Sequence, residues 1–378
     1  MIYLDNAATT KVDPEAVEIM NKIYLEDFGN PSSLYDFGFK SEKHMNKARD
    51  LIAEVLKASP SEIFFTSCGS ESNNIAILSQ VTGNKNQEFI TDVIEHSSVE
   101  QVFSKIEEKY PVHYINVDEK GFVSVDDIIE KINENTKLVS IMAVNNELGS
   151  VQPIEQIGIA IKKKNPKTLF HVDGIQSFGK IPLDLNKAKV DLFSISAHKL
   201  HGPKGVGALF ARKGTPLKPV ILGGGQENNI SSGTENVAGI AALGFVASKA
   251  YQQIEENFKR LAELKEYLFE ELSVIEDIKM NSTIENGSPY ITNICFKDIK
   301  SEVLIHFLEQ DEIYVSSGSA CKKDKKSRVL EGIKIKKEYE EGCIRISFSD
   351  LTTREEVERF LDKLKEAVEE IRKIIRRK

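Results

Sequence analysis

Short apolar runs alternate with longer amphipathic segments along the first two thirds of the chain. Six runs have the length and the content of Ile, Val, Leu and Phe that is typical of buried strands, namely 63–66, 88–91, 138–142, 169–172, 190–195 and 207–210. Most of them are separated by segments long enough for a helix or a crossover. This alternation predicts an α/β fold with a mainly parallel sheet that is covered on both faces.

The pattern changes after residue 237. Apolar residues recur at helical spacing over 237–272, which predicts one long helix. Strand-like runs follow at 293–296, 313–315 and 343–348, and a last helix begins at the capping box Thr353-Arg-Glu-Glu356. We therefore expect a smaller α+β unit and a domain boundary inside the long helix near residue 250, with one domain over 13–250 and the other over 1–12 and 251–378.

Composition excludes some classes of function. The chain has 378 residues, with 50 Lys+Arg against 58 Asp+Glu and a net charge of −8, which argues against nucleic-acid binding by bulk charge. No apolar run reaches membrane-spanning length, and no basic segment followed by an apolar one opens the sequence. The four cysteines are far apart and form no Cys-x-x-Cys pair, so we expect no disulfide framework, no metal site and a reducing, cytoplasmic location.

Two polar residues stand at the ends of successive predicted strands. Lys199 follows the run 190–195 and precedes the breakers of 202–205, so it is either a partly desolvated nucleophile or an ordinary loop lysine. Asp173 ends the run 169–172, where a buried acid needs a positive partner, either a structural arginine or a protonated ring nitrogen of a cofactor. Because ligands bind at the carboxyl edge of open α/β sheets, the two positions indicate a site there.

Three further segments follow predicted strands. The small-residue loop 66–74 leads into a helical run and fits either an anion site or a plain helix cap. His96 fits either a ring that stacks on a flat ligand and moves protons, or a hydrogen-bonded residue at a strand end. Polar turn chemistry accounts for Asn145-Asn146-Glu147 as well as a binding role does.

Cys321 lies among small residues and directly before the basic cluster 322–328. Neighbouring positive charge favours the thiolate, which would make this cysteine reactive, whereas a solvated lysine face beside an inert cysteine is the competing interpretation. His198 and His201 have a spacing that fits metal ligands only on a helix, and Gly202 and Pro203 make this stretch non-helical.

Taken together, these segments resemble the class I, NifS/IscS-like cysteine desulfurases, which are fold-type I pyridoxal-phosphate enzymes. The resemblance runs from Leu4-Asp-Asn-Ala-Ala-Thr-Thr to Ile344-Arg-Ile-Ser-Phe. It implies a large domain with a mostly parallel seven-stranded sheet, a smaller α+β domain that carries the cysteine loop, and a homodimer. It also implies conversion of L-cysteine to L-alanine, with the sulfur held on Cys321 as a persulfide for an iron–sulfur scaffold or a thiolation protein.

The resemblance also implies roles for individual residues. It assigns the cofactor site to Gly69, Ser70, His96, Asn146, Asp173, Gln176, Ser196, His198, Lys199 and, from a second subunit, Thr234. Lys199 would form the Schiff base, Asp173 would pair with the ring nitrogen, and His96 would stack on the ring. Arg345 and Asn146 would bind the substrate, and Cys321 would be the nucleophile that takes the sulfur.

The chain departs from the family pattern at some positions. Tyr35 stands where His is usual, Ser231 and Asn228 stand where Arg is usual, and the segment after Cys321 is shorter and richer in lysine. These changes leave the sulfur acceptor open. Two alternatives remain beside the desulfurase, a selenocysteine or cystine lyase and a cofactor-binding sulfur-relay protein with little turnover.

Overall fold

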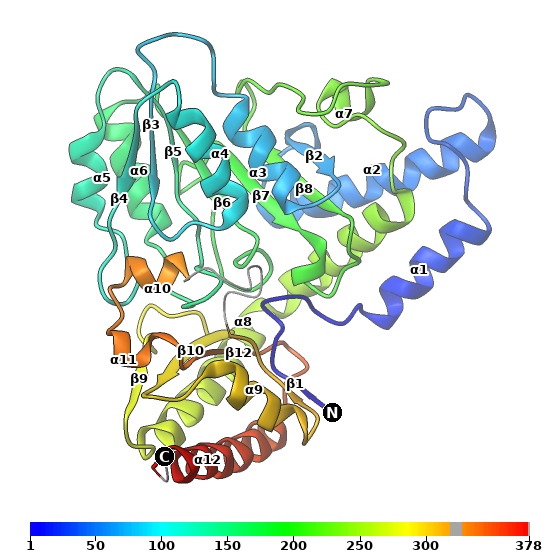
Figure 1. Cartoon of the computed structure of the whole chain (residues 1–378). Helices are drawn as coiled ribbons and strands as arrows, with labels where there is room; N and C mark the ends of the chain where they lie inside the picture. Colours follow the sequence, from blue (N-terminus) through cyan, green and yellow to red (C-terminus); the bar gives the residue numbers. More distant parts are fainter. Residues whose placement is uncertain (318–326, 377–378) are drawn as a thin grey trace.

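The computed structural model describes residues 1–317 and 327–376, with side chains to 375. Its centre is a seven-stranded sheet in the order β2-β8-β7-β6-β5-β3-β4 (Figure 1). The strands are β2 (Ile63–Thr66), β3 (Glu88–Asp92), β4 (Val112–Ile115), β5 (Thr136–Ser140), β6 (Leu169–Asp173), β7 (Leu192–Ser196) and β8 (Gly207–Ala211). The neighbouring pairs from β4 to β7 are parallel, and β8 runs antiparallel to both β7 and β2. The predicted α/β fold with a mostly parallel seven-stranded sheet is confirmed.

Both faces of this sheet are buried because neighbouring residues of one strand pack into different clusters. Phe89 and Leu138 pack with α3 (Gly69–Leu78) and α4 (Ser97–Glu107), whereas Ile90 and Val139 face the opposite cluster. Among the helices that contribute to the opposite cluster are α1 (Pro14–Leu25), α2 (Asp36–Leu56), α5 (Val125–Lys131), α6 (Ile154–Lys164) and α8 (Val237–Ser273). The arrangement is a three-layer α/β/α sandwich.

The second, smaller unit contains an antiparallel sheet in the order β12-β10-β9 and lies below the large sheet in Figure 1. Its elements are β9 (Ile278–Met280), β10 (Ile291–Phe296), α9 (Ser301–Glu309), β11 (Ile313–Tyr314), α10 (Arg328–Gly332), α11 (Lys337–Glu340), β12 (Cys343–Ser347) and α12 (Arg354–Arg376). The predicted capping box is present, since Glu356 N donates to Thr353 Oγ1 at 3.2 Å and Thr353 N donates to Glu356 Oε2 at 3.0 Å.

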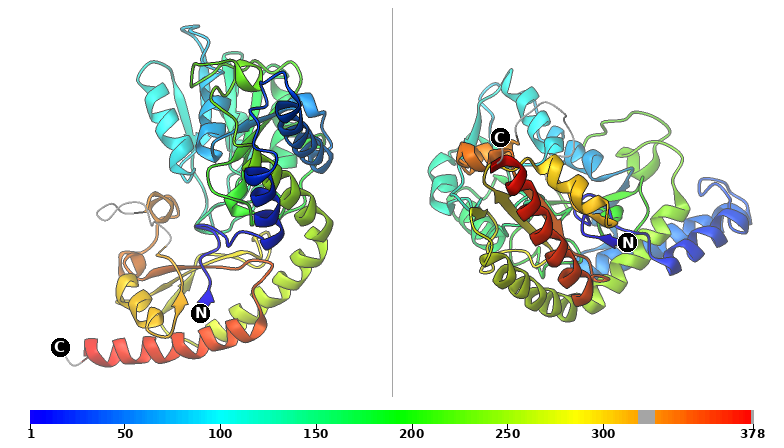
Figure 2. Two further views of the ribbon diagram at one scale, coloured as in Figure 1. Left: turned by 90° about the vertical axis from the view of Figure 1, so that its right-hand side faces the viewer. Right: turned by 60° about the horizontal axis from the view of Figure 1, so that its bottom comes forward.

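The start of the chain belongs to this smaller unit. Strand β1 (Ile2–Tyr3) pairs in parallel with β11, and Asp5 forms a β-bridge with Ser347, the last residue of β12. The N-terminus therefore lies next to the small sheet, as both views of Figure 2 also indicate. From there the chain crosses to the large sheet, because Thr10 N donates to His198 O at 2.9 Å.

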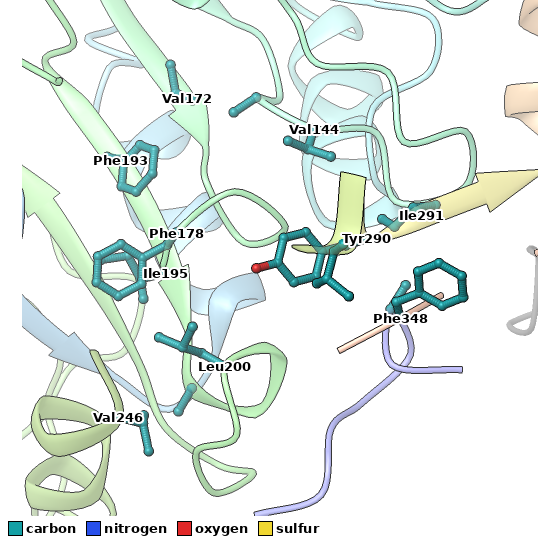
Figure 3. Close-up of a cluster of buried hydrophobic side chains, with 14 of the residues drawn as sticks. Val144, Val172, Phe178, Phe193, Ile195, Leu200, Val246, Tyr290, Ile291 and Phe348 are labelled. Carbon is teal, nitrogen blue, oxygen red and sulfur yellow. The ribbon is translucent and has the colours of Figure 1, made fainter. Parts of the chain in front are cut away.

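Helix α8 connects the large sheet with the smaller unit, as predicted for 237–272. Apolar side chains fill the space between the two units, where Phe178 and Leu200 lie on the side of the large sheet and Tyr290 and Phe348 on the other (Figure 3). The domain boundary near residue 250 stays a prediction. Within the described ranges, no helix combines the length and the apolar character needed to cross a bilayer.

The expectation that the cysteines form no disulfide is wrong for one pair. Cys295 and Cys343 are direct cross-strand partners on β10 and β12, and their sulfurs are bonded. They are 48 residues apart, and only the antiparallel register of two strands brings them together. Cys68 is a free cysteine.

Candidate active site

Loops that follow the carboxyl ends of β2, β3, β5, β6 and β7 open into one cavity of about 290 Å³. This volume suits a small ligand. The expected site residues that line the cavity are Gly69, Ser70, His96, Asn146, Asp173, Gln176, Ser196, His198, Lys199 and Arg345. The cavity also has walls that sequence reasoning did not predict, among them Ala7, Ala8 and Ile175.

Lys199 ends a short 3₁₀ turn that follows β7 directly. Its Nζ donates to the carbonyl oxygens of Ala7 and Ala8, both at 2.7 Å. These two bonds hold the side chain in a fixed direction at the cavity wall, so Lys199 is not an ordinary solvated loop lysine.

Asp173 is buried at the end of β6, beside the strand that leads to Lys199. Its carboxylate accepts hydrogen bonds from Asn73 Nδ2 at 2.8 Å and from Ile175 N at 3.0 Å. Among the residues that the structure describes, no arginine or lysine forms an ion pair with it. The structural-arginine alternative is therefore wrong, and a cationic ligand atom fits the charge of this carboxylate.

Gln176 and Gly69 shape the cavity wall near Asp173. Gln176 Nε2 donates to Ala7 O at 2.9 Å, while its buried Oε1 has no hydrogen-bond partner within residues 1–317 and 327–376. Gly69 allows Ile175 to pack closely, because a Cβ at position 69 would lie 2.3 Å from Ile175 Cδ1. A side chain at position 69 would therefore displace Ile175, which lines the cavity.

The N-terminus of α3 opens into the cavity. Cys68 occupies the N-cap position in an extended conformation, and no side chain of the described residues caps the helix there. The interpretation as a plain helix cap is therefore wrong, because the first-turn N–H groups beside Gly69 and Ser70 have no capping side chain. Together with the helix dipole they can bind a phosphate, and Ser196 and His198 line the same cavity.

The two cavity histidines are neutral near pH 7. His96 caps α4, and its Nδ1 accepts a hydrogen bond from Ser98 N at 3.1 Å, which leaves the ring proton on Nε2. Burial lowers the pKa of His96, with a raising effect of Asp173 and a lowering effect of Lys199. Burial and then the charges of Lys199 and other lysines lower the pKa of His198 to about 4.

Arg345 enters the cavity from β12 of the smaller unit and is almost fully buried. One guanidinium nitrogen, Nη1, donates to Asn146 O at 2.9 Å, and Nη2 lies 2.7 Å from Asp5 Oδ1. Its Nε has no hydrogen-bond partner within the described chain. Arg345 lines the cavity, and its Nη1 and Nη2 each keep a second N–H group that can bind a ligand carboxylate.

In the turn at 145–147, one asparagine stabilises the turn and the next lines the cavity. Asn145 Oδ1 accepts hydrogen bonds from Glu147 N and Leu148 N, both at 2.9 Å, so polar turn chemistry holds for this residue. Asn146 lines the cavity. Burial raises the pKa of Glu147, and a hydrogen bond from Ser327 and the charge of Arg345 act in the opposite direction.

Some expected residues do not meet at the cavity. Thr234 is exposed on the loop between α7 (Gln226–Asn229) and α8 and does not line the cavity. Cys321 lies outside the described residues. Tyr35 is exposed before α2, and Ser231 donates a hydrogen bond to Glu71 Oε1 at 2.8 Å.

The pair His198 and His201 does not face a shared metal position. His198 Nδ1 lies 3.2 Å from Thr9 Oγ1, whereas His201 Nδ1 donates to Lys11 O and His201 Nε2 lies 2.6 Å from Asp350 Oδ1. No cluster of three potential ligands occurs in the described part of the chain.

The family resemblance begins in the segment 5–10, but it assigned no site residue there. Asp5 binds Arg345, the carbonyl groups of Ala7 and Ala8 bind Lys199, and Thr10 Oγ1 donates to His198 O at 3.1 Å. Backbone oxygens carry no residue-type signal, so nothing in the sequence indicated the contacts of Ala7 and Ala8.

The sequence model of the Aminotransferase class-V family matches residues 2–360. The chain belongs to this family. The aminotransferase class-V chain is 39% identical over 379 residues to the cysteine desulfurase IscS of Dictyoglomus turgidum, covering 99% of this chain and 96% of that protein.

Two solved structures are also similar to this class-V chain. A NifS-like protein superposes with a TM-score of 0.92 at 39% identity, over 97% of this chain and 99% of the other. The structure described as SspA in complex with cysteine superposes with a TM-score of 0.81 at 32% identity, over 93% of this chain and 100% of the other. The fold is therefore the fold-type I architecture that the sequence predicted.

Pyridoxal phosphate is the cofactor of this family, and the cavity fits it. The α3 N-terminus suits the phosphate, the Asp173 carboxylate suits a protonated ring nitrogen, and Lys199 would supply the amine for a Schiff base. The unpartnered Gln176 Oε1 suits a hydrogen-bond donor of the ring.

Proposed function

We propose that this chain is a pyridoxal-phosphate-dependent cysteine desulfurase. It converts L-cysteine to L-alanine and takes the sulfur onto Cys321 as a persulfide, for delivery to an iron–sulfur scaffold or a thiolation protein. The observation that carries the proposal is the convergence of Lys199, Asp173 and Arg345, which come from two sheets, on one cavity. The likeness to proteins named cysteine desulfurase supports the choice of substrate.

When bound, pyridoxal phosphate supplies an electron sink for the charge that develops at the α-carbon of the substrate. Asp173 keeps the ring nitrogen protonated, because its fixed carboxylate offers that proton a charged acceptor. Arg345 holds the substrate carboxylate with its unused donors. Lys199, once free of the cofactor, is the base for the α-proton.

The histidine His96 can move a proton at Nε2, because its Nδ1 already accepts from Ser98. This places an N–H group at the cavity, where it can donate a proton to the β-carbon as the C–S bond breaks. The Cys321 thiolate attacks the substrate sulfur, so that an S–S bond forms while the electron pair of the C–S bond stays with the β-carbon. Protonation of that carbon gives alanine, and the sulfur remains on Cys321 as a persulfide.

Homodimer formation is part of the same proposal. Exposed apolar side chains gather around the connection between α1 and α2, which projects from the body of the molecule in Figure 1. Leu34 is fully exposed and Tyr35 is 62% exposed, a pattern typical of an interface rather than of a solvated loop. We propose that Thr234 of the second copy reaches the phosphate end of the cavity in this dimer. We also propose a cytoplasmic location.

The enzymatic proposal is tested by loading the protein with pyridoxal phosphate and measuring alanine release from L-cysteine. Lys199→Ala should remove the Schiff-base absorbance and the activity, whereas Lys204→Ala, an exposed lysine five positions on, should keep both. Cys321→Ser should keep the absorbance and form no persulfide. Alanine release by the Lys199 variant at the wild-type rate would contradict the proposal, and a strong preference for L-selenocysteine would indicate a lyase instead.

The dimer is tested by light scattering. Leu34→Asp should shift the wild-type dimer toward monomer and weaken cofactor retention, because the partner's phosphate contact is lost. A wild-type protein that is monomeric at micromolar concentration would refute the dimer without affecting the assignment of Lys199.

A further inference from the structure

The Arg345 guanidinium is bound by a carboxylate of this chain before any substrate arrives. Asp5 Oδ1 lies 2.7 Å from Nη2, and the side chains are 21% and 4% exposed, respectively. Asn146 O holds Nη1 from the other side at 2.9 Å. The plane of the guanidinium is therefore fixed by two partners from different parts of the chain.

Asp5 is itself held in place by the backbone. The Asp5 carbonyl accepts a hydrogen bond from Ala8 N at 3.0 Å, and Asp5 forms a β-bridge with Ser347, two residues after Arg345 on β12. These contacts fix the backbone of Asp5 at the point from which its carboxylate reaches Arg345. The same turn presents the carbonyls that hold Lys199.

A substrate carboxylate would share Arg345 with Asp5. Nη1 donates to Asn146 O and Nη2 to Asp5 Oδ1, and each of these nitrogens carries a second N–H group that a ligand can use. A substrate carboxylate that binds the remaining donors gains a guanidinium of fixed orientation. Its attraction to Arg345 is weaker than to a lone arginine, because the Asp5 carboxylate partly balances the positive charge and repels a second carboxylate.

We propose that Asp5 is a positioning residue that aligns Arg345 for the amino-acid carboxylate and, by sharing its charge, limits how tightly substrate and product are held. The inference rests on the proposed function, since it concerns the carboxylate of L-cysteine and L-alanine. As a consequence, the enzyme binds L-cysteine and L-alanine less tightly than it would with an Arg345 that had no acidic neighbour. Weaker binding of L-alanine favours its release.

The test uses the protein loaded with pyridoxal phosphate and follows its absorbance during titration with L-alanine, which gives a dissociation constant without turnover. Asp5→Asn keeps the acceptor for Nη2 and removes the charge, so the dissociation constant should fall about three- to tenfold. Asp5→Ala removes charge and acceptor together, so its dissociation constant should be higher than that of the asparagine variant. With L-cysteine, Asp5→Asn should lower KM by a similar factor without raising kcat.

Two controls separate a charge effect from a structural one. L-alanine methyl ester carries no carboxylate, so Asp5→Asn should leave its dissociation constant unchanged. Asp13→Asn removes the same charge from the same N-terminal region, where Asp13 pairs with Lys249 rather than with Arg345 and caps α1, a role that asparagine also fills. This variant should bind L-alanine like the wild type.

The proposal is overturned if Asp5→Asn binds L-alanine as weakly as the wild type or more weakly, or if the ester and the amino acid respond alike. A wild-type protein that shows no spectral response to L-alanine and releases none from L-cysteine would instead refute the proposed function as well. A response in the wild type with no change in Asp5→Asn would refute only the role of Asp5.

Discussion

Asp92 is a buried acid without an ion-pair partner in the described part of the chain, and replacing it by asparagine should stabilise the protein at neutral pH. The residue ends β3 and is 1% exposed. Its Oδ1 accepts from Ile94 N at 2.8 Å, while Oδ2 is buried without a partner in the described chain. Burial raises the pKa of Asp92 from 3.8 to about 7, although the Ile94 bond and the charge of Arg328 act against the rise.

The sign of the effect follows from proton binding. The folded state keeps the proton on Asp92 up to a pH near 7, whereas the unfolded chain releases it near its ordinary pKa of 3.8. The contribution of Asp92 to stability is therefore intact below pH 4 and is lost as the pH rises toward 7. A rise of about 3 pKa units corresponds to a loss of at most about 4 kcal/mol.

The variant Asp92→Asn cannot ionise, and its side-chain oxygen can still accept from Ile94 N. In the folded variant the amide leaves a buried N–H donor without a partner, just as protonated Asp92 leaves a buried O–H donor without one. The cost of such an unsatisfied donor, about 1–3 kcal/mol, is therefore similar in the two proteins at low pH. The advantage of the variant should thus grow by about 2–3 kcal/mol between pH 5 and pH 8.

Urea unfolding at pH 5, 6, 7 and 8, followed by circular dichroism because the chain has no tryptophan, measures this advantage. Glu134→Gln is the matched control, since it removes an exposed acid and should give a curve parallel to that of the wild type. If the stabilities of the wild type and Asp92→Asn run parallel over this pH range, Asp92 is charged in the folded protein and the reasoning fails.

Three further outcomes are expected. Arg345→Lys replaces a fork of donors by a point charge, so kcat/KM for L-cysteine should fall about 10- to 100-fold, mainly through KM, and an unchanged KM would show that Arg345 does not bind the carboxylate. Asn73→Ala removes one of the hydrogen bonds that fix Asp173, so equilibrium dialysis should find cofactor retention weakened about tenfold, and equal retention would deny Asn73 this positioning role. Thiol titration of the unfolded, unreduced protein should find two of its four thiols, because Cys295 and Cys343 are bonded, and four thiols without reductant would contradict the pairing.

Most of the fold was readable from the sequence because the strands of the large sheet are buried on both faces and stand out as apolar runs. The exception is β4, whose Val112, His113 and Tyr114 are only half-buried, so this edge strand has no apolar run. Strand β5 begins at Thr136, two residues before the predicted run at 138–142. Apolar content alone does not fix where a strand begins, whereas the hydrogen-bonded pairing of β5 with β3 and β6 does.

The site was readable where residue type and strand position coincide. Lys199 and Asp173 stand at the ends of neighbouring parallel strands, so the common edge of the sheet indicated that they meet. Asn73 and Asp5 were missed because their roles depend on partners 100 and 340 residues away in the sequence. Local pattern carries no information about contacts of that separation.

The N-terminal segment also ties the completion of the site to the order of protein synthesis. Asp5 leaves the ribosome first but must wait for Arg345, 340 residues later, before its ion pair can form. At typical translation rates that delay is roughly 20–70 s, during which the carbonyls that will hold Lys199 have no fixed neighbour from β12. The nascent chain can therefore build its large sheet early, whereas the ability to bind substrate arises only when the last strand has been made.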